Sequence, residues 1–250
     1  MTLFGQSRSR VARDHALIEP GSFVTTALVG WERTQGVVLI SPRLGARFTQ
    51  YLAMMEAGAS ASPTLAGIER CVYVLDGSLT VQSPGAAQRT LDAGGFAFLP
   101  PDDRTTLRAA AACKLNVFEK RYTPRSGAAS PARIVGHERD IKGEPFLGDP
   151  AARLQVLLPD EPGFDMAVNI FRFAPGAALP FVEAHVMEHG LLMIAGQGVY
   201  RLSDCWYPVR AGDVIWMAPF CPQWFVAMGK EPAGYLYYKD VNRDPIEGAP

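Results

Sequence analysis

Short apolar stretches alternate with turn residues along the whole chain, and this pattern predicts a protein built from β-strands. Nine stretches are rich in Val, Ile, Phe and Tyr and are bounded by Gly, Pro or Asp, as strands and their turns usually are. A long segment with the 3.6-residue period of a helix is absent. The predicted strands span 36–42, 48–55, 71–82, 94–100, 114–122, 166–173, 189–202, 213–219 and 233–241.

The pattern of the first half recurs in the second half. Gly77 aligns with Gly196 at an offset of 119 residues, and Gly94 aligns with Gly212 after an adjustment of one residue. Two further segments, at 56–59 and 118–120, match the second half in the same order. This repeat predicts two homologous β-domains in tandem.

The repeat also suggests domain boundaries. We expect an N-terminal arm or swapped edge element over 1–25 and a first domain over 26–122. A second domain is expected over 151–250. The stretch 123–150 begins with residues rich in Gly, Pro, Ser and Ala, and this composition favours a linker.

Composition narrows the class of protein. Gly and Pro together make 44 of the 250 residues, which suits many tight turns. The 24 basic and 25 acidic side chains balance, so no global field favours nucleic acid or an anionic membrane. No apolar run is long enough for a membrane span, and the chain start lacks the apolar core of a signal peptide. The four scattered cysteines read as reduced thiols. We therefore expect a cytoplasmic protein.

Two of the four histidines lie close together in the second half. Glu183, His185 and His189 share parity, so an extended backbone would direct them to one face. Gln223 follows after a Pro-containing turn. One carboxylate, two imidazoles and an amide oxygen suit Mn, Fe, Ni or Zn, and the lack of a thiolate argues against a structural zinc site.

Two other readings of this segment stay open. His185 to His189 also satisfies the HxxEH pattern of inverted zinc peptidases, which requires a helix. The same residues could instead be polar positions on a surface strand. The remaining histidines, His15 and His137, are expected at the surface or in an interface.

The corresponding positions of the first half lack these ligands. They are Thr64, Ala66, Arg70 and Thr105, and a cationic Arg70 would repel a metal ion. We therefore expect a metal-free first domain and a single active centre in each chain.

The spacing of these residues resembles the two motifs of the cupins, the metal-binding jelly-roll barrels. Gly176 precedes Glu183-x-His185, three residues separate His185 from His189, and Gly196 follows. In the second motif Gly212 precedes Gln223. Glu183 and Gln223 stand where cupins usually carry histidine. A bicupin with this substitution in its second barrel is similar to the (S)-ureidoglycine aminohydrolase family, and the similarity covers nearly the whole chain.

That resemblance implies a fold, a cofactor and a reaction. The fold is all-β, with tandem jelly-roll barrels. The cofactor is Mn²⁺, bound by Glu183, His185, His189 and Gln223. The reaction hydrolyses (S)-ureidoglycine to (S)-ureidoglycolate and ammonia in purine (allantoin) degradation.

The same resemblance implies the residues that handle the substrate. Tyr200, Tyr235 and Lys239 would bind it, and Lys239 is the cation available to its carboxylate. Tyr235 and Lys239 share parity on one predicted strand. Glu183 is the ligand best suited to accept or return a proton as ammonia leaves. The catalytic residues expected are therefore Glu183 and Lys239.

Two other functional classes remain open at this stage, a metal-dependent cupin dioxygenase and a non-catalytic bicupin that binds a small molecule. Gln223 in place of the last histidine argues against a dioxygenase. The metal-ligand residues that the second half retains argue against a non-catalytic binding protein. The expected partners are a small-molecule substrate and further copies of the chain in a homo-oligomer. Neither nucleic acid nor a membrane is expected as a partner.

Overall fold

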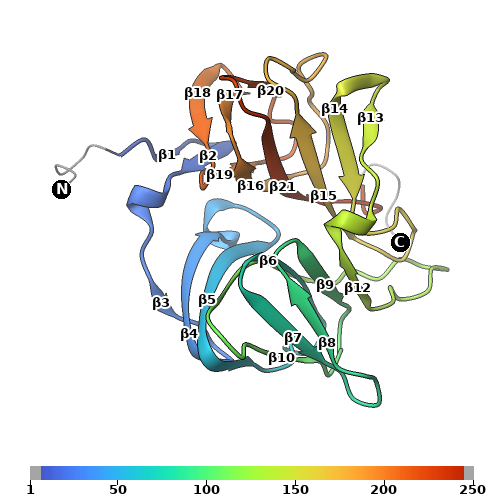
Figure 1. Cartoon of the computed structure of the whole chain (residues 1–250). Helices are drawn as coiled ribbons and strands as arrows, with labels where there is room; N and C mark the ends of the chain where they lie inside the picture. Colours follow the sequence, from blue (N-terminus) through green and yellow to red (C-terminus); the bar gives the residue numbers. More distant parts are fainter. Residues whose placement is uncertain (1–6, 245–250) are drawn as a thin grey trace. The chain divides into compact units, whose positions relative to one another are not determined.

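The computed structural model describes residues 7–244 and is built from antiparallel β-strands and three short 3₁₀-helices. It contains two compact units. We call residues 24–141 and 161–165 the N-terminal unit, and residues 7–23, 142–160 and 166–244 the C-terminal unit (Figure 1). The all-β fold expected from the sequence is confirmed. None of the helices in the described part of the chain has the length and apolar character needed to cross a membrane.

The N-terminal unit holds one ten-stranded sheet, in which strands follow the order β12-β9-β6-β11-β5-β10-β7-β8. Strand β4 also pairs with β5, and β3 pairs with β4. The elements are β3 (Thr26–Ala27), β4 (Trp31–Ile40), η2 (Pro42–Leu44), β5 (Thr49–Ala61), β6 (Ile68–Asp76), β7 (Ser78–Gln82), β8 (Arg89–Asp92), β9 (Gly95–Leu99), β10 (Thr106–Arg108), β11 (Cys113–Arg121), β12 (Ile134–His137) and η3 (Glu138–Asp140).

The C-terminal unit holds an eight-stranded sheet and a three-stranded sheet. Their orders are β1-β2-β19-β16-β21-β15-β14-β13 and β18-β17-β20. The elements are β1 (Arg10–Val11), β2 (His15–Ile18), η1 (Pro20–Ser22), β13 (Glu144–Phe146), β14 (Asp149–Val156), β15 (Met166–Phe173), β16 (His189–Ala195), β17 (Gln197–Leu202), β18 (Cys205–Arg210), β19 (Val214–Met217), β20 (Gln223–Ala227) and β21 (Ala233–Asp240).

The two units repeat the same strand connections. In the first, β6 pairs with β9 and β11, and in the second β16 pairs with β19 and β21. The next strand outward repeats as well, because β12 pairs with β9 as β2 pairs with β19, although β1 adds one further strand beyond β2. Strand β12 comes from the expected linker 123–150, and β2 comes from the expected N-terminal arm. Each segment completes a sheet, because its backbone groups find partners on an open edge.

The glycines that align the repeat occupy equivalent tight turns. Gly77 has φ of 76° and Gly196 has φ of 66°, a region that favours glycine. A Cβ at Gly77 would lie 2.3 Å from Ala112 O, and a Cβ at Gly196 would lie 2.4 Å from Pro232 O. Backbone conformation and a close backbone approach both require glycine at these two positions.

Gly196→Ala is expected to lower the free energy of unfolding by at least about 3 kcal/mol, because left-handed strain and overpacking add. Gly148→Ala is the matched control in the same unit. Its φ is 86°, but no atom lies within 4 Å of the added Cβ. That variant should lose only about 1 kcal/mol. Urea unfolding monitored by tryptophan fluorescence measures both, and equal losses would show that the carbonyl approach does not matter.

Aromatic residues fill the core of the C-terminal unit. Phe173 packs against Phe171 and Phe225, with ring centroids 5.3 and 4.9 Å apart. Tyr235 contacts all three rings. Tyr200 packs beside it with a centroid distance of 6.1 Å. The apolar core thus extends to phenol groups at one end, where the unit opens into a cavity.

Candidate metal centre and active site

A cavity of about 160 Å³ lies within the C-terminal unit, among strands β16, β17, β20 and β21. All residues expected at the site from the sequence line it. They are Glu183, His185, His189, Tyr200, Gln223, Tyr235 and Lys239. Side chains from segments up to 56 residues apart in sequence therefore meet around one space.

A backbone bridge aligns the two ligands that depart from the usual cupin pattern. Glu183 N donates to Gln223 O and Gln223 N donates to Glu183 O, both at 2.8 Å. Residues that exchange both hydrogen bonds across an antiparallel pair point their side chains to the same face. The bridge therefore directs the carboxylate of Glu183 and the amide of Gln223 into the cavity together.

The two histidines lie close together, but one belongs to a strand and the other to an irregular segment. His189 opens strand β16, where it pairs with Met217 and Lys239. His185 lies in an irregular segment before it, and its carbonyl accepts a hydrogen bond of 2.7 Å from Phe220 N. The segment between the histidines is not helical, so the zinc-peptidase reading does not apply. His189 and Gln223 are buried, so the surface-strand reading does not apply either.

The distances between ligand atoms fit a metal ion. His185 Nε2 lies 3.2 Å from His189 Nε2 and 3.1 Å from Gln223 Nε2, and a half-turn of the Gln223 amide would place its oxygen, the ligating atom, at that position. Ligands at about 2.1 Å from an ion are separated by about 3.0 Å when they bind at right angles. His189 Nδ1 faces Tyr238 O at 3.3 Å, a contact that orients a ligating imidazole through its other nitrogen.

Burial sets the electrostatics of these groups. It lowers the pKa of His189 to about 3, and the neighbouring His185 adds to this effect. Burial also lowers the pKa of His185 and raises that of Glu183, where Lys239 acts in the opposite direction. Both imidazoles are therefore neutral near pH 7, the form that coordinates a metal.

The residues that line the cavity also include one lysine and three tyrosines. Lys239 lies on β21 with Tyr235 and Tyr237, at alternate positions of the strand. Burial raises the pKa of Tyr200, Tyr235 and Tyr237 above the ordinary tyrosine value. These phenols stay protonated near neutral pH, and the hydroxyls of Tyr200 and Tyr235 hydrogen-bond to each other.

The N-terminal unit carries a different arrangement at the corresponding place. Arg70 on β6 pairs with Glu119 on β11, as His189 on β16 pairs with Lys239 on β21. Arg70 Nε donates to Glu119 at 2.5 Å and stacks over Trp31 at 5.1 Å. Thr64 bonds to Ile68 O, and Thr105 bonds to Ser83. The register shows that Glu119 corresponds to Lys239, one residue from the alignment suggested by sequence.

His15, expected at the surface or in an interface, is buried within the C-terminal unit. It is 2% exposed, because β2 pairs with β19 and places His15 opposite Met217. His15 Nδ1 contacts Asp14 at 2.9 Å and His15 Nε2 contacts the Tyr207 hydroxyl at 2.8 Å. His137 is an edge residue of β12, with its Nε2 at 3.0 Å from Ala93 O.

Asp14, His15 and Cys221 form a second group of ligand types, with candidate atoms within 4.8 Å of one another. Their polar atoms bond to protein partners, since Asp14 also bonds Ser203 and Ser203 contacts Cys221. Asp14 O accepts a hydrogen bond from Ala218 N. This group therefore ties the N-terminal strand to the loop that precedes Gln223.

Sequence reasoning missed several residues of the cavity wall. Phe146 comes from the expected linker 123–150, and Leu154 lies just beyond it. Phe146 packs against Phe171 with ring centroids 4.9 Å apart. Met187 and Met217 also line the cavity. The parity of β21 was a usable signal for Tyr237, whereas no local signal pointed to Phe146.

Comparisons with known proteins also find a cupin domain and similar folds. An EutQ-like cupin domain model matches residues 44–122. A crystal structure of the Escherichia coli protein Ylba superposes with a TM-score of 0.85 at 32% identity and covers 96% of both chains. A putative glyoxylate-induced protein from Pseudomonas aeruginosa gives a TM-score of 0.88 at 30% identity, over 97% of this chain and 94% of that one.

Curated relatives are closer in sequence. A probable (S)-ureidoglycine aminohydrolase from rice is 43% identical over 97% of this chain and 78% of its own length. The (S)-ureidoglycine aminohydrolase of Arabidopsis thaliana is 42% identical over 97% and 80%, respectively. The Escherichia coli K12 enzyme of the same name is 35% identical over 92% and 89%.

The duplicated all-β fold and the cupin match define the protein as a bicupin. Within the bicupins, the chain belongs to the (S)-ureidoglycine aminohydrolase family. It is therefore a hydrolase.

Proposed function

We propose that this protein hydrolyses (S)-ureidoglycine to (S)-ureidoglycolate and ammonia in purine (allantoin) degradation, and that it depends on Mn²⁺. The observation that carries the proposal is the meeting of Glu183, His185, His189 and Gln223 with Lys239 around one small cavity. The relatives that bear the name of this activity supply the substrate. In this reaction the bond between the carbon and its amine breaks, a bond between that carbon and the water oxygen forms, and a proton from water leaves with the amine as ammonia.

The cavity suits a substrate of this size. Its volume of about 160 Å³ is many times the roughly 10–15 Å³ that one water needs by the same measure. A linear molecule with nine non-hydrogen atoms is small enough for such a space. Phe171, Leu191 and Met217 line the cavity with apolar surface, which limits water around the reacting carbon.

Glu183, His185, His189 and Gln223 would hold the metal ion. Two neutral imidazoles, a carboxylate and an amide oxygen are a donor set suited to Mn²⁺, and no thiolate competes for a softer ion. When bound, the ion supplies Lewis acidity and orients the substrate.

The other residues bind the substrate and move its protons. Lys239 pairs with the substrate carboxylate, since its ammonium is the cation that lines the cavity. Tyr200 and Tyr235 bind the substrate through their protonated hydroxyls, which also hydrogen-bond to each other. Glu183 faces the same space, and we assign it the transfer of a proton between the attacking water and the departing amine.

Removal of the metal is expected to reduce ammonia release from freshly generated (S)-ureidoglycine by at least about a hundredfold, because the substrate loses its Lewis acid. Added Mn²⁺ should restore the rate, and more fully than Mg²⁺ or Zn²⁺. The measurement compares chelator-treated, dialysed protein with and without each ion, and follows the stereochemistry of the product. A racemic product formed at the uncatalysed rate, or an unchanged rate after stripping, would refute the proposal.

A further inference from the structure

We propose that Tyr237 binds the ureido group of the substrate, and that Asn169 acts through Tyr237 by fixing the direction of its hydroxyl. This inference rests on the function proposed above. Tyr237 is thus a substrate-binding residue in addition to Tyr200 and Tyr235, and Asn169 is a positioning residue behind the cavity wall.

Tyr237 lies between two residues already assigned to the substrate. It alternates with Tyr235 and Lys239 on β21, so the three side chains leave the strand on the same face. Its ring lines the cavity and packs edge-on against His189, with centroids 5.7 Å apart. The phenol therefore faces the space that holds the candidate metal ligands.

Asn169 determines which way the Tyr237 hydroxyl can donate. The two residues are direct partners in the register of β15 and β21, and Asn169 Nδ2 donates to the Tyr237 hydroxyl at 3.2 Å. This bond uses an acceptor lone pair of the phenol oxygen, so its proton is available to another acceptor. Among the described residues this is the one hydrogen bond that Tyr237 makes, and the residue lines the cavity.

The buried side chain of Asn169 lowers the stability of the fold, which suggests that it is retained for a function. The side chain is 2% exposed, and its Oδ1 has no hydrogen-bond partner in the described part of the chain. A buried amide with an unsatisfied oxygen destabilises a protein relative to an apolar residue of the same shape. Polar groups that break this rule in a core are commonly found at functional sites.

The N-terminal unit lacks this pair. There the corresponding strands are β5 and β11, and the corresponding partners are Tyr51 and Val117. The hydrogen-bonded pair of Asn169 and Tyr237 therefore occurs in the unit that also carries Glu183, His185 and His189. On the corresponding strands the N-terminal unit instead buries a pair of amides, Gln50 and Asn116, joined by a hydrogen bond of 2.9 Å. The pairing of an amide with a phenol that lines the cavity is what distinguishes the C-terminal unit.

The ureido group is the part of the substrate that needs a donor here. Lys239 takes the carboxylate, and it lies two residues, or about 6.8 Å, farther along the strand than Tyr237. The ureido carbonyl is the remaining uncharged oxygen acceptor of the molecule. A donor directed at this oxygen would distinguish a ureido compound from a simple small carboxylate.

The test compares Tyr237→Phe, Asn169→Leu and the double variant, each loaded with Mn²⁺. Titration calorimetry measures the affinity for (S)-ureidoglycolate and for glycolate, which has the carboxylate and hydroxyl but no ureido group. Tyr51→Phe removes a buried phenol in the other unit and serves as the matched control. Bound Mn²⁺ and thermal unfolding are measured for every variant.

We expect Tyr237→Phe to weaken (S)-ureidoglycolate binding about tenfold, the size of one lost hydrogen bond, and glycolate binding less than threefold. KM for (S)-ureidoglycine should rise with kcat nearly unchanged, because the bond forms equally in the ground and transition states. Asn169→Leu should shift the same quantities by about threefold, and should have no further effect in the Tyr237→Phe background. Tyr51→Phe should bind both ligands as the unmodified protein does.

The outcomes separate this inference from the proposed function. Ammonia release by the unmodified protein tests the function alone. Equal losses for the two ligands, or additive effects of the two substitutions, would overturn the role of Tyr237 and Asn169 even if ammonia is released. If the unmodified protein releases no ammonia, the proposed function fails, and calorimetry still decides the inference. No preference of the unmodified protein for (S)-ureidoglycolate over glycolate would overturn it.

Discussion

His189→Ala is expected to abolish metal binding and to reduce kcat/KM by at least about a thousandfold, since the ion supplies several kcal/mol of transition-state stabilisation. His189 Nε2 lies 3.2 Å from His185 Nε2, and its ring is neutral because burial lowers its pKa to about 3. An alanine leaves the proposed metal site with a single imidazole. Elemental analysis of protein purified without chelators gives the metal content, and ammonia release gives the activity.

His137→Ala is the control for this change. It removes an imidazole from the N-terminal unit, where His137 contacts Ala93 O on the edge of the sheet. This variant should keep its metal and its activity. Circular dichroism establishes that both variants fold. Stoichiometric metal in folded His189→Ala protein, with activity within tenfold of the unmodified chain, would exclude His189 as a ligand.

Lys239→Met is expected to lower kcat/KM by about a hundredfold to a thousandfold while the protein keeps its metal. Loss of a cation that pairs with a substrate carboxylate in a partly buried site costs about 3–4 kcal/mol. Metal affinity should stay equal or increase, because removal of a positive charge near the ligands reduces repulsion of a divalent cation. Steady-state kinetics and metal titration measure the two effects.

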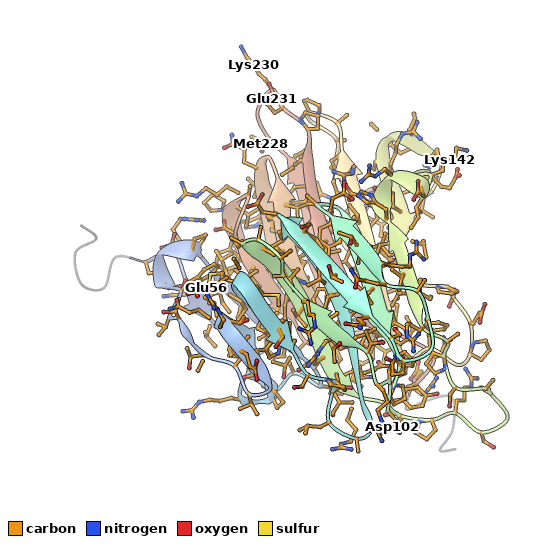
Figure 2. The ribbon with its side chains drawn as sticks, turned by 60° about the horizontal axis from the view of Figure 1, so that its bottom comes forward. Glu56, Asp102, Lys142, Met228, Lys230 and Glu231 are labelled. Carbon is orange, nitrogen blue, oxygen red and sulfur yellow. The ribbon has the colours of Figure 1, made fainter. Side chains whose placement is uncertain are left out.

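Lys230→Met is the matched control for Lys239→Met. Figure 2 shows Lys230 projecting outward from the loop between β20 and β21, and the residue is exposed. Its replacement should alter neither kinetics nor metal content. Bound metal should be lost in His189→Ala and kept in Lys239→Met. This difference in metal content distinguishes a metal ligand from a substrate-binding residue. Loss of metal in Lys239→Met would mean that Lys239 acts on the metal centre and not on the substrate.

Local patterns predicted much of the candidate site. The parity of Glu183, His185 and His189 suggested a common face, although the structure reaches the same result through a backbone bridge and an irregular segment and not through one extended strand. The parity of Tyr235 and Lys239 suggested that both side chains enter one opening, and both line the cavity. These predictions needed only the alternation of side chains along a strand.

Local sequence patterns did not predict which distant segments pair with each other. Phe146 belongs to a stretch expected as a linker, yet β13 joins the sheet through β14 and brings this ring to the cavity. His15 belongs to the segment expected as an arm or a swapped edge element, and its pairing partner was not predictable: β2 pairs with β19, which buries His15. Both segments are short and lack clear alternation, so only the unpaired edges of the sheets determine where they bind.

The sequence by itself determined the all-β class, the duplication, the turns that require glycine and the residue types able to bind a metal. These features depend on side-chain alternation and on backbone conformation, both of which are local. The tertiary structure decided which residues meet. His189 stands between Met217 and Lys239, and Asn169 stands behind Tyr237. Hydrogen bonds between strands from distant parts of the chain set that register, and no single strand encodes its partner.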